Sequence, residues 1–361
     1  MKALRYHGRR DFRLEELPEP VPGPGEVKVK VKFCGICGSD MHEYLAGLSG
    51  VPTGRPHPAT GMMAPIVGGH EFSGVVSELG ENVQGIAVGD RVSIRPTMPC
   101  YECEYCEQGR YVQCVKLATI GLAADGGFAE YTIVREDCVV PLPDSMSFQA
   151  GAYVEPLACG VHAVNRGRMR PGDVAVVLGV GCIGMMAMQA ALAMGASKVF
   201  VFETVAERRE MALRLGATDA FDPTKVDPGK TIAALTNKRR ADIAFECAGV
   251  PATMLLADEV TGRGATIVEV GAMLSPCEFP FLNLFLREKS IVASQGYLND
   301  EFEQAAKLIA TGQVRTEPMT TDTISLNDVM SRGFDVLAGE QRNAHCKILV
   351  SPELSGEARG G

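Results

Sequence analysis

Residues 172–184, Gly-Asp-Val-Ala-Val-Val-Leu-Gly-Val-Gly-Cys-Ile-Gly, decide the fold of this chain. Their apolar run, residues 174–178, follows a Pro-Gly turn and is typical of a strand that is buried on both faces of a parallel sheet. The glycines that follow have the spacing G-x-G-x-x-G, and helix-like sequence begins directly after them. A strand, this glycine spacing and a helix in succession predict a βαβ unit whose loop binds a dinucleotide.

The three glycines each have a physical role in such a loop. Gly179 permits the tight turn, Gly181 lets the backbone approach the pyrophosphate, and Gly184 allows the helix to pack closely on the strand. The N-terminus of the helix adds free N–H donors and partial positive charge for the phosphates. The predicted cofactor-binding residues are Gly179, Val180, Gly181, Cys182, Ile183, Gly184, Glu203, Arg208, Val270, Gly271 and Ser294.

Glu203 indicates which dinucleotide is bound. It ends the next predicted strand, about 20 residues after the glycines, where an acidic side chain binds the ribose hydroxyls. A carboxylate at this place repels a 2′-phosphate, so the sequence favours NAD over NADP. Arg208 and Arg209 lie nearby in the sequence and keep NADP as an alternative.

The alternation of strands and helices continues on both sides of this unit. Further strands are predicted at 198–202, 242–246, 265–270 and 291–294, and helices at 185–194, 206–215 and 252–260. This alternation predicts a doubly wound parallel sheet. The first 150 or so residues are instead rich in Gly and Pro and have short apolar alternations, such as 27–31 and 72–76, which predict a β-rich body.

The end of the chain is predicted to return to the β-rich body, through a helix at 301–310 and a strand at 347–350. The predicted fold is therefore α/β with two domains. Residues 1–152 and 297–361 form the β-rich domain, and residues 153–296 form the dinucleotide-binding domain.

Composition and charge narrow the classes of function. The chain has 361 residues, 46% of them hydrophobic and 22% charged, which is ordinary for a globular protein. A net charge of −9 argues against nucleic acid or an anionic membrane as the partner. The sequence has no apolar run long enough to span a membrane and no apolar core of a secretory signal at its start. These features predict a cytoplasmic protein.

Four of the twelve cysteines, Cys100, Cys103, Cys106 and Cys114, lie within one short segment. Zinc favours tetrahedral coordination by thiolates, and a site closed by four of them has no open position, so it is structural. An iron–sulfur cluster and a redox pair are the alternatives, but the spacing is unlike the common ferredoxin runs. We therefore predict a structural zinc ion. The scattered cysteines, apart from Cys37, are interpreted as packing residues.

A second group of residues suits a catalytic zinc ion. Cys37 is followed closely by Ser39 and His42, Gly-Gly-His70-Glu71 comes later, and Glu155 lies beyond. Catalytic zinc uses three protein ligands and leaves one position for water or substrate. One thiolate, one imidazole and one carboxylate would satisfy this rule.

These motifs, over nearly the whole chain, resemble the zinc-containing medium-chain dehydrogenases, and within them the polyol branch with its butanediol (acetoin) dehydrogenases. The matching segments are residues 37–44, 57–61, 69–74, 126–131, 155–158 and 347–352. The resemblance implies a GroES-like β-rich catalytic domain and a Rossmann cofactor domain. It implies Cys37 and His70 as zinc ligands and Glu155 as the third, with Glu71 as a ligand or its exchange partner. The sequence leaves open which of the two carboxylates binds.

The resemblance also implies a reaction, the transfer of hydride from a small secondary alcohol to NAD. Zinc would lower the pKa of the alcohol, Ser39 would accept its proton, and His42 would pass that proton to solvent. The implied substrate is a vicinal diol such as 2,3-butanediol, or its hydroxyketone, acetoin. Relatives that oxidise sorbitol have an arginine in the segment 294–297, where this chain has glycine, so a long polyol is disfavoured.

Three other functions compete with this interpretation. The segment 48–63 carries Met62 and Met63, which favours an apolar entrance and a larger hydrophobic secondary alcohol. A threonine-type amino alcohol is the second alternative, and a non-catalytic protein that binds zinc and NAD is the third. By resemblance, the chain is expected to form a homo-oligomer, either a dimer or a tetramer.

Overall fold

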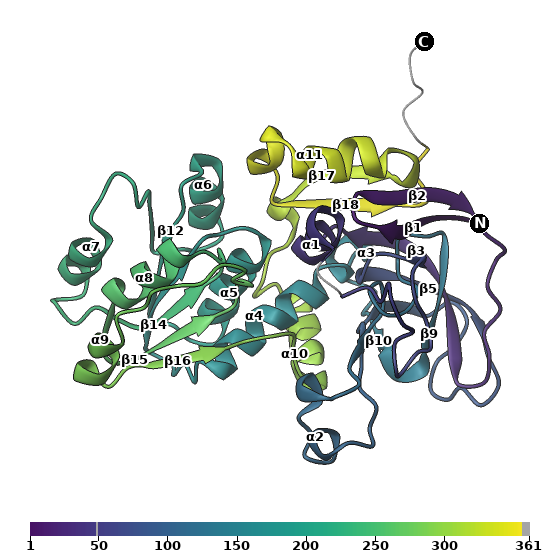
Figure 1. Ribbon diagram of the computed structural model, residues 1–361, viewed down its shortest axis with the longest axis horizontal. Helices are drawn as coiled ribbons and strands as arrows, with labels where there is room; N and C mark the ends of the chain where they lie inside the picture. The colour runs from purple at the N-terminus through teal and green to yellow at the C-terminus, as the bar shows by residue number, and fades with distance from the viewer. Residues whose placement is uncertain (48–49, 356–361) are drawn as a thin grey trace, which may run out of the picture. The chain divides into compact units, whose positions relative to one another are not determined.

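The computed structural model describes residues 1–47 and 50–355, which fall into two compact units (Figure 1). Unit 1 comprises Met1–Glu155 together with the chain from Thr320 onward, and unit 2 comprises Pro156–Met319. Within the described ranges, no helix is both long and apolar enough to cross a membrane.

Unit 2 is built on a parallel sheet of six strands in the order β13-β12-β11-β14-β15-β16. Its strands are β11 (Val174–Leu178), β12 (Lys198–Phe202), β13 (Asp219–Phe221), β14 (Ala241–Glu246), β15 (Thr261–Glu269) and β16 (Ser290–Ala293). Its helices are α4 (Val154–Arg166, which begins at the end of unit 1), α5 (Cys182–Ala193), α6 (Ala206–Arg214), α7 (Pro228–Leu235), α8 (Pro251–Val260), α9 (Phe281–Arg287) and α10 (Asn299–Ala310).

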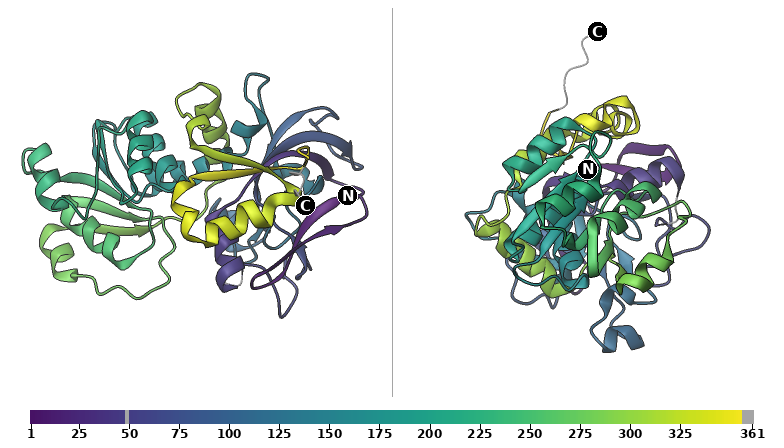
Figure 2. Two further views of the ribbon diagram at one scale, coloured as in Figure 1. Left: turned by 90° about the horizontal axis from the view of Figure 1, so that it is seen from above. Right: turned by 90° about the vertical axis from the view of Figure 1, so that its left-hand side faces the viewer.

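The strand order reverses at β11, which has β12 on one side and β14 on the other. Because crossovers between parallel strands are right-handed, this reversal places helices on both faces of the sheet (Figure 2). The carboxyl ends of β11 and β14 meet at the reversal, which is where open α/β sheets bind their ligands. The predicted doubly wound sheet is confirmed, although β13, α7 and α9 were not predicted from the sequence.

The boundary of unit 2 differs from the predicted one because α10 belongs to unit 2 rather than to the β-rich unit. A buried contact explains this difference. Nδ1 of His162 on α4 lies 2.7 Å from Oε2 of Glu301 on α10, and Asn165 of α4 donates a hydrogen bond to the other oxygen of Glu301. The chain therefore leaves unit 2 near Met319, not near residue 297.

Unit 1 is the β-rich body, and its largest sheet has seven strands. Six strands follow the order β10-β6-β5-β3-β18-β17, and β9 also pairs with β3. The strands of unit 1 are β1 (Lys2–Gly8), β2 (Asp11–Glu16), β3 (Glu26–Gly35), β4 (Ile66–Val67), β5 (Glu71–Leu79), β6 (Arg91–Ile94), β7 (Thr97–Met98), β8 (Ala118–Thr119), β9 (Tyr131–Arg135), β10 (Val139–Pro141), β17 (Thr320–Ser325) and β18 (Lys347–Ser351). Its α-helices are α1 (Gly38–Ala46), α2 (Glu104–Glu107), α3 (Phe148–Gly151) and α11 (Asp335–Ala338).

The register of three strands positions the candidate site. Gly35, at the end of β3, is paired with Glu71 at the start of β5 and with Leu349 of β18. Apolar side chains of β3 such as Val27, Val29 and Val31 are fully buried in the core of this unit. The burial of one strand face fixes the register, because a slip by one residue would turn these side chains outward. The loops after β3 and before β5 are thereby brought together.

Candidate functional site

The candidate metal site in unit 1 consists of Cys37, His70 and Glu71. One ligand atom from each of the three lies within 4.8 Å of the others. His70 is 5% exposed and Glu71 is fully buried, whereas Cys37 is partly exposed, so the imidazole and the carboxylate are shielded from solvent. Oε1 of Glu71 has no hydrogen-bond partner among the described residues, which leaves a buried oxygen free to bind an ion. A thiolate, an imidazole and a carboxylate suit zinc.

Asp40 supports this group from α1. Its Oδ2 accepts a hydrogen bond of 2.9 Å from the backbone N–H of Cys37 and so caps the helix. Its Oδ1 lies 3.5 Å from Nδ1 of His70, within ion-pair range but long for a hydrogen bond. Burial lowers the pKa of His70, but the charges of Asp40 and Cys37 outweigh it and hold that pKa well above its usual value. A carboxylate at Nδ1 orients an imidazole so that Nε2 can bind a metal.

Lys347 of β18 contacts Glu71 from the other side. Its Nζ lies 2.5 Å from Oε2 of Glu71, and it also donates a hydrogen bond of 3.1 Å to the backbone oxygen of Ile36. Both side chains are almost completely buried, with 3% of Lys347 and none of Glu71 exposed. The lysine therefore pairs with one carboxylate oxygen, while the other has no hydrogen-bond partner in the part of the chain that the structure describes.

The remaining predicted site residues of unit 1 occupy different positions. Oγ of Ser39 lies 3.2 Å from Nε2 of His70, and His42 is exposed on the same helix, α1. Glu155 is buried at the start of α4, but the group of ligand atoms described above contains Glu71 and not Glu155. Among the described residues, Glu71 is thus the carboxylate that is grouped with Cys37 and His70, and the choice between Glu71 and Glu155 as zinc ligand stays a prediction.

The four clustered cysteines also meet in space. Sγ of Cys100 lies 3.9 Å from that of Cys106 and 3.4 Å from that of Cys114, and the sulfurs of Cys103 and Cys106 are 3.5 Å apart. Four sulfurs around zinc at the usual Zn–S distance would be about 3.8 Å apart, so the observed spacing fits one zinc ion. Hydrogen bonds from the backbone N–H groups of Val115 and Cys106 lower the pKa of Cys103 to about 6.

In unit 2 the glycine loop joins β11 to α5 as predicted. Gly179 has φ of +82°, in the region that favours glycine, and a Cβ on Gly184 would collide with the backbone oxygen of Gly179. Gly181 caps the N-terminus of α5, and a Cβ on it would meet no atom within 4 Å, so its backbone is open to a ligand. The turn at Gly179 and the close packing at Gly184 thus agree with the local roles expected of these glycines, whereas the approach of a pyrophosphate to Gly181 stays a prediction.

Glu203 follows β12 and is 7% exposed. Its Oε2 accepts a hydrogen bond of 2.9 Å from the backbone N–H of Val180 in the glycine loop. Its Oε1 accepts hydrogen bonds from the N–H of Val205 and the hydroxyl of Thr204. The carboxylate is thus fixed beside the loop, where a ribose would lie.

The other predicted cofactor residues surround the same edge of the sheet. Val270 and Gly271 directly follow β15, and Ser294 directly follows β16. Arg208 is half-buried on α6. Its neighbour Arg209 donates a hydrogen bond to the backbone oxygen of Glu203 and lies 3.6 Å from Asp222, so its charge is already paired.

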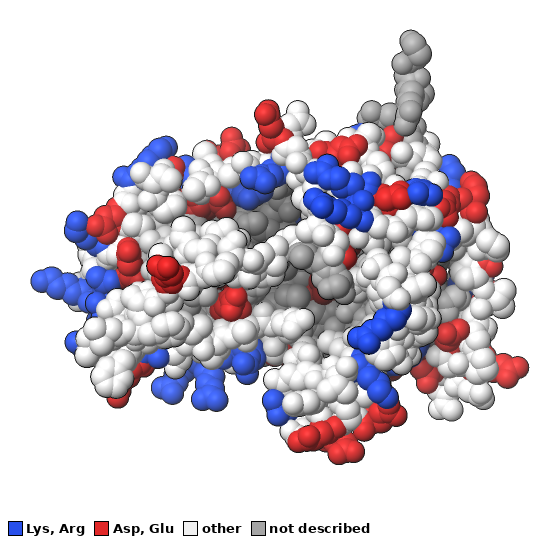
Figure 3. All heavy atoms as spheres, in the orientation of Figure 1, with Lys and Arg blue, Asp and Glu red and all other residues white. Residues whose placement is uncertain are grey.

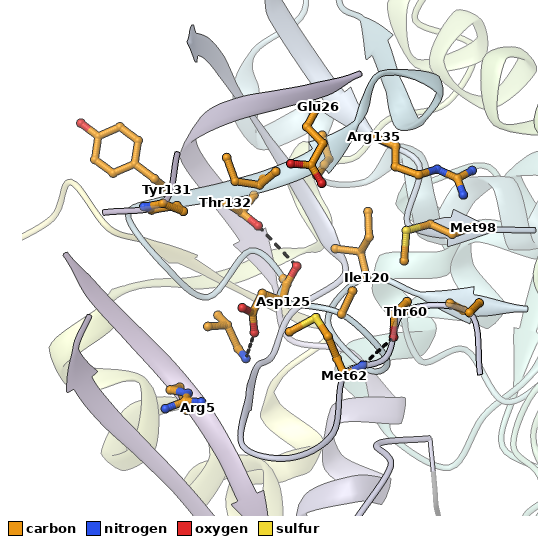
Figure 4. Close-up of a pocket in the computed structure, with 18 of the residues that line it drawn as sticks. Arg5, Glu26, Thr60, Met62, Met98, Ile120, Asp125, Tyr131, Thr132 and Arg135 are labelled. Atoms are coloured by element: carbon orange, nitrogen blue, oxygen red, sulfur yellow. Dashed lines mark hydrogen bonds between the residues drawn. The ribbon is translucent and has the colours of Figure 1, made fainter. Parts of the chain in front are cut away.

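Met62, which suggested an apolar entrance, lines a different cavity (Figure 4). This cavity of unit 1 measures about 760 Å³ and is also lined by Met98, Ile120 and Asp125, but its lining includes neither Cys37 nor His70. Leu48, at the start of the same segment, and Ser49 lie outside the described residues. The observation that favoured a larger hydrophobic substrate is thereby weakened.

The charged side chains on one face of the molecule can be compared with the composition of the chain. On the face shown in Figure 3, acidic and basic side chains are interspersed rather than gathered by sign. The described residues on this face therefore form no broad patch of a single sign of charge.

Two residues that contact the metal site, Asp40 and Lys347, were not predicted from the sequence. Asp40 could have been found, because it stands three residues after Cys37 at the start of a helix, where an acidic side chain caps the N-terminus. Lys347 gave no local signal, since it is 276 positions from Glu71 and only the pairing of β18 with β3 brings it there.

Comparison with known protein families agrees with both units. Residues 23–144 match the family model described as "Alcohol dehydrogenase GroES-like domain", and residues 182–311 match the one described as "Zinc-binding dehydrogenase". The predicted combination of a GroES-like domain and a Rossmann-type domain is thus confirmed.

Full-length relatives are also known. The chain is 38% identical to (R,R)-butanediol dehydrogenase of Bacillus subtilis, over 98% of this chain and 100% of the relative. It is 34% identical to sorbitol dehydrogenase of the same species, over 98% of this chain and 97% of the relative.

Solved structures give the same result. The crystal structure of 2R,3R-butanediol dehydrogenase from Bacillus subtilis matches with a TM-score of 0.91, at 38% identity, and covers 98% of this chain and 99% of the other. A zinc-binding dehydrogenase from Sinorhizobium meliloti, solved with NADP bound, matches with a TM-score of 0.88, at 32% identity, over 97% of this chain and 99% of that one.

Proposed function

Because the chain belongs to the zinc-binding alcohol dehydrogenase family, we propose that it interconverts a small vicinal diol and its hydroxyketone, with NAD as the hydride acceptor. The enzyme is a zinc-dependent alcohol oxidoreductase that uses a nicotinamide cofactor. The observation that carries the proposal is the buried group of Cys37, His70 and Glu71 in the unit that resembles diol dehydrogenases.

We propose that Cys37, His70 and a carboxylate hold the catalytic zinc, and that Glu71 is the protein carboxylate in the resting site. Glu155, which the family resemblance implied as the third ligand, would then be the exchange partner from the start of α4. When bound, zinc supplies Lewis acidity that lowers the pKa of an alcohol, and the nicotinamide accepts the hydride. The four-cysteine group would hold a second, structural zinc.

The side chains of this chain would move the proton. Oγ of Ser39 lies 3.2 Å from Nε2 of His70, one of the groups that would hold the zinc, and would therefore lie within reach of the hydroxyl of an alcohol substrate. The hydroxyl of Ser39 can accept the proton of that alcohol while it donates its own onward. His42 lies exposed on the same helix, where its imidazole can exchange a proton with solvent. Asp40 would keep His70 oriented throughout.

Glu203 supports NAD rather than NADP in this proposal. Its carboxylate is fixed by the N–H groups of Val180 and Val205, so it cannot turn away from a 2′-phosphate without loss of both hydrogen bonds. The related structure with NADP bound makes the choice worth measuring. Glu203→Ser should raise the Kd for NAD and reduce the discrimination against NADP, whereas an unchanged ratio of the two Kd values would contradict the assignment.

We also propose that the protein forms a homo-oligomer through the outer edge of unit 2. β16 is the last strand of the sheet, and α9 beside it exposes a group of large apolar side chains. These are Phe281, Leu282, Phe285 and Leu286. An unpaired strand edge and an exposed apolar patch are features of a protein–protein contact. Among the described residues the twelve cysteines form no disulfide, which fits a reducing compartment and supports a cytoplasmic location.

The function is tested by measuring turnover on a panel of vicinal diols, hydroxyketones, larger secondary alcohols and 3-hydroxy amino acids. The rate is measured from the change in the absorbance of NADH. The highest kcat/KM is expected for a small vicinal diol, and turnover on none of the panel would favour a non-catalytic binding protein. Ser39→Ala should lower kcat by about 10²-fold or more while both zinc ions remain bound. Loss of the metal in this variant would refute the proton-relay role of Ser39.

A further inference from the structure

Glu246 is a buried carboxyl group that the proposed mechanism does not use. It is the last residue of β14, and none of its surface is exposed. Its backbone oxygen accepts hydrogen bonds from the N–H groups of Val270, at 2.8 Å, and Gly271, at 2.9 Å. Both of those residues are among the predicted cofactor contacts. Glu246 therefore lies at the sheet edge where the dinucleotide would bind.

The side chain of Glu246 holds the next three residues, Cys247, Ala248 and Gly249, which we call the 247–249 turn. Its Oε1 accepts hydrogen bonds from the N–H groups of Ala248 and Gly249, each at 2.9 Å. The same oxygen accepts a third, of 2.7 Å, from the hydroxyl of Thr253 in the first turn of α8. One oxygen thus joins the turn to the start of the helix.

The 247–249 turn in turn contacts the glycine loop. A Cβ added to Gly179 would lie 2.9 Å from Cβ of Ala248, which is closer than side chains approach one another. Ala248 is therefore packed closely against Gly179, and its position limits how far Gly179 can move towards the turn. A shift of the turn would be transmitted to the loop that is proposed to bind the pyrophosphate.

The turn also contacts the segment that follows β15. A Cβ on Gly271 would collide with the backbone nitrogen of Gly249 and would lie 2.9 Å from its Cα. Gly249 itself has φ of +67°. Because glycine can adopt many other backbone conformations, contacts with neighbouring residues are needed to hold it in this one. The turn is consequently packed between two segments that are both proposed to contact the cofactor.

We propose that Glu246 is a positioning residue for the dinucleotide, whose carboxyl group fixes the 247–249 turn and thereby the spacing between the glycine loop and Gly271. This inference rests on the proposed function of unit 2 as the nicotinamide dinucleotide site. It assigns to Glu246 no contact with the reacting atoms. Its effect is on cofactor affinity, through the turn.

The hydrogen-bonding pattern of the Glu246 carboxyl group indicates which substitution preserves this role. Burial raises its pKa against the opposing effect of its three hydrogen bonds, and the nearby charge of Glu269 raises it further. Oε2 has no hydrogen-bond partner among the described residues, so only Oε1 acts as an acceptor to the turn. Glutamine keeps an acceptor oxygen of the same shape, whereas leucine keeps the volume and removes the acceptor.

The experiment compares three single variants in the full-length, zinc-loaded protein. Glu246→Gln keeps the acceptor, Glu246→Leu removes it, and Glu301→Leu is the matched control. Glu301 is also a buried carboxyl of unit 2 that accepts hydrogen bonds from a backbone N–H, that of Leu298, and from side chains, but it serves α10. The Kd for NAD is measured by calorimetry well below the melting temperature of each variant.

Glu246→Leu is expected to raise the Kd for NAD about tenfold, a factor that corresponds to the loss of roughly one net hydrogen bond. Glu246→Gln and Glu301→Leu should bind NAD within about twofold of the original chain, a difference smaller than one hydrogen bond. Should Glu246→Leu fail to fold, Thr253→Val, which removes one of the three donors, is expected to raise the Kd by a smaller factor.

Two results would overturn the inference. One is an unchanged Kd in Glu246→Leu, or in Thr253→Val where only that variant folds. The other is an equal rise in Glu301→Leu, which would show general destabilisation of unit 2. Failure of the original chain to bind NAD or NADP would instead refute the dinucleotide site itself, and the role of Glu246 with it.

Discussion

Removal of the Lys347 amine should destabilise unit 1 strongly, because it would leave the buried Glu71 carboxylate without its counter-charge. Nζ of Lys347 lies 2.5 Å from Oε2 of Glu71, and the two side chains are 3% and 0% exposed. Water cannot replace the lysine at such a site. The loss of one partner from a buried ion pair costs about 3–5 kcal/mol, whereas replacement of both by apolar residues is often neutral.

The magnitude should depend on zinc. Oε1 of Glu71 has no hydrogen-bond partner among the described residues, so without a metal the carboxylate in Lys347→Met would lose its ion-pair partner on Oε2 and gain no donor on Oε1. A zinc ion bound to Glu71 would supply positive charge and reduce the loss. We therefore expect Lys347→Met to lower the free energy of unfolding by about 3–5 kcal/mol in chelated protein and by less in the zinc-loaded protein.

The assay is urea unfolding followed by circular dichroism, because the chain has no tryptophan. Since two units can unfold separately, hydrogen exchange of amides in β3 and β5 assigns the transition to unit 1. Lys28→Met is the control, because the partners of Lys28, Glu19 and Glu78, are about half exposed and such pairs contribute only about 0–1 kcal/mol.

The double variant Lys347→Met with Glu71→Met should recover most of the loss, because no buried charge remains in it. The reasoning is refuted if Lys347→Met loses no more stability than Lys28→Met. It is also refuted if the double variant is no more stable than the single one.

Three further outcomes follow from other parts of the structure. Cys103→Ser should release one of the two proposed zinc ions, as measured by metal analysis, while Cys138→Ser, a buried cysteine outside the cluster, should retain both. Burial raises the pKa of Glu43, so the folded state holds its proton more tightly than the unfolded state does. Stability should accordingly fall as pH rises from the ordinary carboxyl pKa through the raised one, and Glu43→Gln should abolish this part of the slope of unfolding free energy against pH. Phe285→Asp, at a side chain 79% exposed on α9, should lower the mass measured by sedimentation, whereas Val88→Asp in unit 1, 62% exposed, should not.

The sequence by itself determined the class of fold because the decisive signals are local. The apolar strand, the spaced glycines and the start of α5 are consecutive in the chain, and each acts through its immediate neighbours. The four cysteines from Cys100 to Cys114 are equally local, since one short loop can close around an ion without a long excursion of the chain. Both features appear in the structure with the geometry that these interactions require.

The end of unit 2 could not be read from the sequence in the same way. The helix at 301–310 was predicted correctly, but its place was not, because it depends on the buried contact of Glu301 with His162, which is 139 residues away. No residue next to Glu301 or His162 in the sequence indicates that the two side chains pair. Missed elements such as β13 and α9 are short and lack a clear periodicity.

The metal site shows the same division between local and distant information. The sequence identified Cys37, His70 and the two candidate carboxylates, since their residue types suit zinc. Only the tertiary structure placed Glu71 with Cys37 and His70, through the pairing of β3 with β5, and brought Lys347 to it through β18. Such partners are chosen by strand register, which is fixed by the burial of whole strand faces and not by any residue near the site.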